Sequence, residues 1–127
     1  MWVGEGLTGT IPPEIGQLDG LTQLFLGENE ISGPLPPSIG NLTSLDCLSL
    51  YENALEGPLP TSIGNLTSLT KLYLHDNIFS GIVPSTLANL TNLLFLYLQN
   101  NAFTTNVPSS GIHLDRDGVK NFLATLN

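Results

Sequence analysis

A repeat of 24 residues is the sequence feature that most limits what this chain can fold into. Each repeat begins with a leucine, and further leucines follow three and five residues later. An asparagine comes next, then an apolar residue, a glycine, and a leucine or valine followed by proline. The first leucine column is Leu21, Leu45, Leu69 and Leu93. Columns that recur over four turns predict a solenoid in which each turn buries its apolar residues against its neighbours.

Both ends of the chain depart from this repeat. The first twenty residues match the second half of one more turn, but Trp2 stands in a leucine column and Glu5 in the asparagine column. The apolar residues of the last segment are Val119, Phe122, Leu123 and Leu126. Their spacing is that of one helix face. We predict a solenoid over residues 1–116, with a partial first turn at 1–20 and turns starting at 21, 45, 69 and 93, and a capping helix at 117–127.

These columns resemble the plant-type leucine-rich repeat, LxxLxLxxNxLxGxIPxxIGxLxx, over nearly the whole chain. The Gly-x-Ile/Leu-Pro element separates this class from other leucine-rich repeats. The resemblance implies an α/β solenoid that winds as a right-handed superhelix. A parallel sheet would line its concave side, with 3₁₀ and extended segments on the convex side. In that family the repeats occur in receptor-like proteins and receptor kinases, in enzyme inhibitors and in intracellular proteins. The paired-cysteine caps of secreted members are missing.

The polar columns have a structural explanation. In a strand of the pattern x-Leu-x-Leu-x, the leucines point inward and the other residues outward. The asparagine that follows lies inside the bend, where its amide can bond the backbone of neighbouring turns. We predict that these residues form a structural ladder: Asn29, Asn53, Asn77 and Asn101. Gly33, Gly57 and Gly81 permit the backbone geometry of the next bend.

The outward strand positions form the candidate ligand-binding face. Its residues are Phe25, Tyr51, Lys71, Tyr73, His75, Phe95 and Tyr97, with Glu28, Glu52 and Asp76 along one edge. The leucine columns already fill the core, so the aromatic residues are not needed there. Aromatic side chains are enriched at binding hot spots. The pattern therefore predicts a protein or peptide ligand and favours a basic one. The alternative is cross-strand stacking that only stabilises the sheet.

No catalytic, metal or cofactor site is expected. The edge carboxylates should lie about 5 Å apart, one per turn, without converging on a point. His75 and Cys47 belong to no recognisable nucleophile motif, and His113 lies in a variable position. The sequence contains no phosphate-binding loop and no zinc-ligand pair. We expect a binding protein and not an enzyme.

The charge balance bears on partners and location. Eleven acidic and three basic residues give a formal net charge of −8, which disfavours nucleic acid. No apolar run reaches the roughly 20 residues of a membrane-spanning helix, so we expect no membrane insertion by this segment. No signal peptide is visible and Cys47 is the one cysteine. These features favour an intracellular location, although a fragment of an extracellular protein would look the same.

An Asn-Leu-Thr triplet begins at Asn41, Asn65 and Asn89. Each is a glycosylation acceptor if the chain enters the secretory pathway, but the repeat pattern alone also explains the triplets. The leading hypothesis is an interaction module with a receptor-like or scaffold role. The alternatives are an inhibitor of a secreted cell-wall hydrolase, a regulatory segment of a larger intracellular signalling protein, and ice binding by the Asn and Thr rows. The partner and the oligomeric state stay open.

Overall fold

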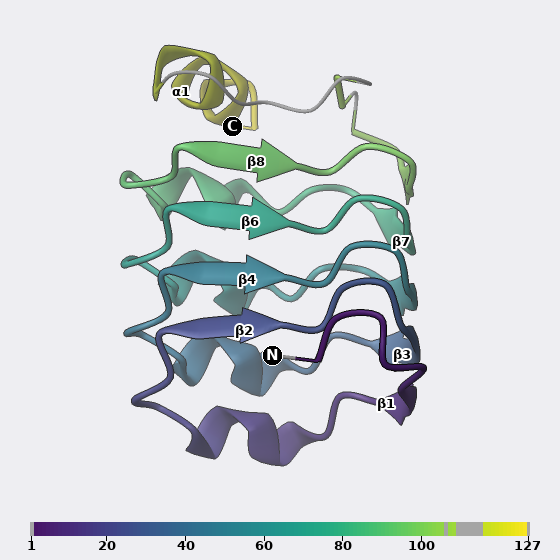
Figure 1. The fold of residues 1–127 in the computed structure, drawn as a ribbon. Helices are drawn as coiled ribbons and strands as arrows, with labels where there is room; N and C mark the ends of the chain where they lie inside the picture. The colour runs from purple at the N-terminus through teal and green to yellow at the C-terminus, as the bar shows by residue number, and fades with distance from the viewer. Residues whose placement is uncertain (1, 106, 109–115, 127) are drawn as a thin grey trace.

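The computed structural model describes residues 2–105, 107–108 and 116–126. The chain winds through successive turns that stack directly on one another, and the C-terminal helix lies across the last of them (Figure 1). Each full turn contains a concave strand, a second short strand and a 3₁₀ helix. The predicted solenoid architecture is confirmed.

The concave strands form one parallel sheet, in the order β2-β4-β6-β8. These strands are β2 (Gln23–Phe25), β4 (Cys47–Ser49), β6 (Lys71–Tyr73) and β8 (Phe95–Tyr97). Residues that are one repeat apart face each other, so that Leu24 lies beside Leu48 and Leu72 beside Leu96. Repeat columns in the sequence are therefore rows of neighbours on this face.

A second parallel sheet, which the sequence analysis did not predict, runs β1-β3-β5-β7-β9. Its strands are β1 (Thr8–Thr10), β3 (Glu30–Pro34), β5 (Ala54–Gly57), β7 (Ile78–Gly81) and β9 (Ala102–Phe103). The sequence predicts only 3₁₀ and extended segments in this part of each turn. Pro34 is the last residue of β3 and Pro58 follows β5, so neither interrupts the middle of its strand.

In the described ranges, four 3₁₀ helices form the remaining side of the stack. They are η1 (Pro13–Gln17), η2 (Pro37–Asn41), η3 (Thr61–Asn65) and η4 (Ser85–Asn89). An extended proline precedes each of them. Neighbouring 3₁₀ helices approach so closely that a Cβ added at Gly64 would lie 2.5 Å from the carbonyl oxygen of Thr86. Glycine therefore sets the spacing of the turns on this side.

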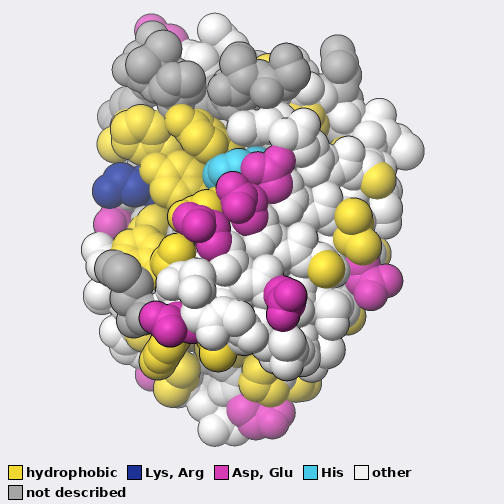
Figure 2. Space-filling model, turned by 45° about the vertical axis from the view of Figure 1, so that its right-hand side comes forward, with side chains coloured by type: hydrophobic (Ala, Val, Ile, Leu, Met, Phe, Trp, Pro, Cys, Tyr) yellow, Lys and Arg dark blue, Asp and Glu magenta, His cyan; other side chains and the backbone are white. Residues whose placement is uncertain are grey.

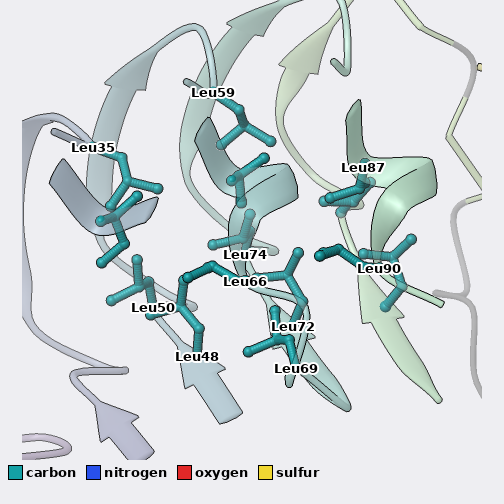
Figure 3. Packing of buried hydrophobic residues seen from close by; sticks show 14 of the residues in the cluster. Leu35, Leu48, Leu50, Leu59, Leu66, Leu69, Leu72, Leu74, Leu87 and Leu90 are labelled. Atoms are coloured by element: carbon teal, nitrogen blue, oxygen red, sulfur yellow. The ribbon is translucent and has the colours of Figure 1, made fainter. Parts of the chain in front are cut away.

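The core is a continuous column of leucine and isoleucine side chains between the two sheets and the 3₁₀ helices (Figure 3). At the C-terminal end, α1 (Arg116–Ala124) contacts η4 and buries Val119, Phe122 and Leu123. At the N-terminal end the side chains of Trp2 and Leu18 are more than half exposed. None of the helices in the described ranges is long and apolar enough to cross a membrane.

Candidate ligand-binding face

The asparagine column fixes the bend at the end of each concave strand. The side-chain Oδ1 of Asn77 accepts a hydrogen bond from the N–H of Leu55 (3.0 Å), and its Nδ2 donates to the carbonyl of Leu50 (2.9 Å). Both partners lie in the preceding turn. The same pair of inter-turn contacts recurs at Asn29, Asn53 and Asn101. Each amide thus joins two turns and satisfies backbone groups that the bend leaves open.

The residue before each of these asparagines has a left-handed backbone. Its φ is +57° at Glu28, +53° at Glu52, +58° at Asp76 and +58° at Asn100. This conformation turns the chain away from the strand and sets the side chain at the edge of the concave face. The Oη of Tyr51 donates to Glu28 Oε1 (2.9 Å), and Nδ2 of Asn100 donates to Asp76 Oδ1 (2.7 Å). The carboxylates form a row along this edge, beside His75 (Figure 2).

Four of the predicted residues form one aromatic cluster: Tyr51, Tyr73, His75 and Tyr97. The rings of Tyr51 and His75 are stacked, with centroids 5.1 Å apart and planes 3° from parallel. Tyr97 lies against both His75 (5.2 Å) and Tyr73 (5.1 Å) at steeper angles. The cluster draws on three successive turns. All four side chains are partly accessible to solvent.

Gly27 is a contributor to this face that the sequence analysis did not select. It occupies the same column as Tyr51 and His75 but is buried, because the ring of Tyr51 lies over it. The sequence does contain a sign of this role, because Gly27 has no side chain at a repeat position where the following turns have large ones. Its meaning depends on the rotamer of Tyr51, which the sequence does not specify.

The remaining predicted residues surround the cluster. Lys71 begins β6, and Phe25 and Phe95 lie in the outer strands, all partly accessible. The outward positions of the intervening strand β4 are covered: Cys47 is 2% exposed and Ser49 3%. These small side chains are shielded from solvent by the larger side chains around them. Burial raises the pKa of the Cys47 thiol, outweighing the opposing effect of Lys71. The thiol is therefore protonated and poorly nucleophilic at neutral pH.

Burial also shifts the titration of the aromatic cluster. It lowers the pKa of His75, against the opposing fields of Asp76 and Glu52, so the imidazole is neutral at pH 7. Burial raises the pKa of Tyr73, and burial together with the Glu28 hydrogen bond raises that of Tyr51. Tyr51, Tyr73 and His75 therefore present uncharged rings at pH 7.

Other predicted sites lie away from this face. Asn41, Asn65 and Asn89 are exposed at the ends of η2, η3 and η4. Within the described part of the chain, no three His, Cys, Asp or Glu residues are placed to hold a metal ion. His113 lies outside the described residues. An apolar hollow of about 430 Å³ lies between η4 and α1, and no residue of the aromatic cluster is part of its lining.

Comparison with known proteins identifies the class. A family model described as a leucine-rich repeat region matches residues 6–106. The ectodomain of the receptor kinase SOBIR1 from Arabidopsis thaliana is 34% identical with a TM-score of 0.80, covering 87% of this chain and 60% of that one. The Arabidopsis receptor kinase HAESA, solved with the peptide hormone IDA and the co-receptor SERK1, is 38% identical with a TM-score of 0.77, covering 81% of this chain and 17% of that one.

A plant ice-binding protein is also similar, at 38% identity and a TM-score of 0.73, covering 76% of this chain and 32% of that one. The search of curated proteins gives no match. The chain belongs to the leucine-rich-repeat family, in its plant-type class. It spans between about one sixth and three fifths of the length of these structural relatives.

Proposed function

We propose that the concave aromatic face binds a peptide, or an extended segment of a protein, in a receptor-like or scaffold role. One observation carries the proposal. The leucine core is complete without the aromatic cluster, yet four rings from three turns are gathered where solvent can reach them. Such side chains supply contact area at little cost in conformational entropy.

The relatives support a ligand of this kind. HAESA is described in complex with a peptide hormone, and so is the plant receptor RGFR1, which is 36% identical to this chain. The face also has the form that a peptide requires, because it is an open row of strands and not a closed pocket. The alternative is that the aromatic rings only stabilise the sheet by cross-strand stacking. That alternative explains the contacts between the rings, but not why the rings lie beside a row of carboxylates.

Selection from a displayed library of random peptides tests the proposal. The protein is compared with a Tyr73→Ala/Tyr97→Ala variant, which removes half of the aromatic cluster. Ile78→Ala/Ile82→Ala is the matched control, because these exposed apolar residues lie in and just after β7, in the other sheet. We expect peptides selected on the wild type to bind the control equally and the tyrosine variant at least tenfold more weakly, as for loss of a hot spot.

Equal binding to all three proteins, with thermal unfolding unchanged, would place the peptide site elsewhere. Failure to enrich any peptide on the wild type would also contradict the proposal.

Ice binding is a second candidate, favoured by a different surface. Thr43, Thr67 and Thr91 are exposed one turn apart, and one structural relative is an ice-binding protein. Replacing the middle residue, Thr67→Tyr, would interrupt this row without touching the concave face. Thermal hysteresis that is present in the wild type and lost in this variant would support ice binding. Its absence in the wild type would exclude it.

A further inference from the structure

The charges around the aromatic cluster are divided between its two sides. Glu28, Glu52 and Asp76 each follow a concave strand and form a row along one edge, one carboxylate per turn. Lys71 stands at the start of β6, whereas the carboxylates follow the other end of the strands. A ligand that covers the rings therefore meets negative charge at one edge and positive charge at the other.

The middle carboxylate is the one available for a ligand. Glu28 accepts a hydrogen bond from Tyr51, and Asp76 accepts one from Asn100. Glu52 is exposed, and within the described ranges its side chain has no hydrogen-bond partner. Its backbone N–H donates to the backbone carbonyl of His75 (3.1 Å), which holds the backbone of Glu52 against the next turn. Glu52 directly follows Tyr51 of the aromatic cluster in the chain.

We infer that the peptide ligand presents an arginine side chain here, with its guanidinium group against the rings of the aromatic cluster and paired with Glu52. This inference rests on the proposed function. A guanidinium is flat, is less strongly hydrated than an ammonium, stacks on aromatic faces and bonds a carboxylate through two N–H groups. The surface supplies both halves of that contact on neighbouring turns. The protein's net charge of −8 also favours the approach of a basic peptide.

Two measurements test the assignment on peptides selected by the wild-type protein. The first asks whether arginine is enriched at a fixed position among the selected sequences. The second compares the affinity of a selected peptide with that of the same peptide carrying citrulline, which keeps the shape of arginine but has no charge. Each peptide is titrated against the wild type, Glu52→Gln and Glu14→Gln. Glu14 is an exposed carboxylate in η1, so its variant controls for the change in net charge.

We expect citrulline to weaken binding to the wild type about tenfold, the scale of a desolvated cation–π contact with a paired carboxylate. Glu52→Gln should weaken binding of the arginine peptide similarly and leave the citrulline peptide almost unaffected, while Glu14→Gln changes neither. Equal affinities of the two peptides for the wild type would overturn the arginine contact. Selected peptides with no arginine, or with lysine in its place, would overturn it as well.

These outcomes are separate from failure of the proposed function. Peptides that need Tyr73 and Tyr97 but are indifferent to citrulline and to Glu52→Gln would leave peptide binding in place and remove the arginine contact alone.

Discussion

Gly27 lies directly beneath the ring of Tyr51: a Cβ added to the glycine would stand 2.8 Å from both Cδ1 and Cζ of the tyrosine. The ring can lean over the preceding turn because that turn has no side chain at this position. Leaning also brings the Tyr51 hydroxyl within 2.9 Å of Glu28. One missing side chain thus sets the orientation of the first ring of the aromatic cluster.

The first prediction follows from this contact. Gly27→Ala should push the Tyr51 ring away from Glu28 and disturb its stacking on His75, lowering affinity for a selected peptide severalfold. Stability should fall by no more than about 1 kcal/mol, because the partly exposed Tyr51 ring can swing out towards solvent. Titration and thermal unfolding check both. In a Tyr51→Ala background the same glycine change should have no effect on either; a persistent loss there would mean that the glycine acts through another contact.

The asparagine ladder gives a second prediction. Asn77→Ala removes the side-chain acceptor of the Leu55 N–H inside the stack, whereas the carbonyl of Leu50 keeps its hydrogen bond from Nδ2 of Asn53. An unsatisfied buried backbone group costs about 1–3 kcal/mol, so we expect a loss of that size in the free energy of unfolding. Urea denaturation measures it. Asn65→Ala, at an exposed position in η3, is the control and should change stability by less than about 0.5 kcal/mol.

The spacing of the 3₁₀ helices gives a third prediction. Gly64→Ala would drive a methyl group into the backbone of Thr86, which cannot move without separating two turns. Forced overpacking costs about 1–3 kcal/mol, and more where backbone must shift. Gly20→Ala meets nothing within 4 Å and serves as the control. If the melting temperatures of the two variants agreed, close contact between 3₁₀ helices would not be what spaces the turns.

The left-handed edge residues give a fourth. Glutamate at φ +53° carries a steric cost that asparagine largely avoids. Glu52→Asn should therefore raise the free energy of unfolding by about 0.5–1 kcal/mol. Removing a charge from an acidic protein could itself stabilise it, so Glu52→Gln is the comparison: it removes the charge and keeps the long side chain. Equal gains in the two variants would attribute the effect to charge and not to the backbone.

Acid should weaken the fold through His75. Its pKa in the folded protein lies below the ordinary value of 6.5, because burial disfavours the charged imidazole. The unfolded chain therefore binds more protons as the pH falls below about 6.5, and this contribution to stability is full above that pH and lost as the pH falls through the folded pKa. Between pH 7 and pH 5, the free energy of unfolding measured by denaturation should fall less for His75→Gln than for the wild type. Parallel declines would show that other groups govern the pH dependence.

The sequence predicted the stack because leucine spacing reports directly on which side chains are buried, and the same column arithmetic placed Tyr73, His75 and Tyr97 on one face. It did not predict the second sheet, since strands as short as β9 carry no periodic pattern. It also did not predict that Cys47 and Ser49, which occupy outward strand positions, are buried. A side chain that points outward from a strand is still shielded from solvent when its neighbours are large. The extent of this shielding depends on the rotamers of the neighbouring side chains. The roles of Gly27 and of the left-handed carboxylates likewise depend on backbone angles and packing.

The glycines between the 3₁₀ helices have a mechanical consequence. Where backbone touches backbone, as at Gly40 and Ser62, the stack has no soft side chains to compress, so the distance between turns is fixed. The concave face is then rigid, and its outward side chains recur at a fixed interval of one turn. A peptide that binds this face must place its side chains at the same interval. Because the protein is already rigid, most of the conformational entropy lost on binding is lost by the peptide. Peptides that are already extended or stiffened by proline should therefore bind this face more tightly than flexible peptides with the same side chains.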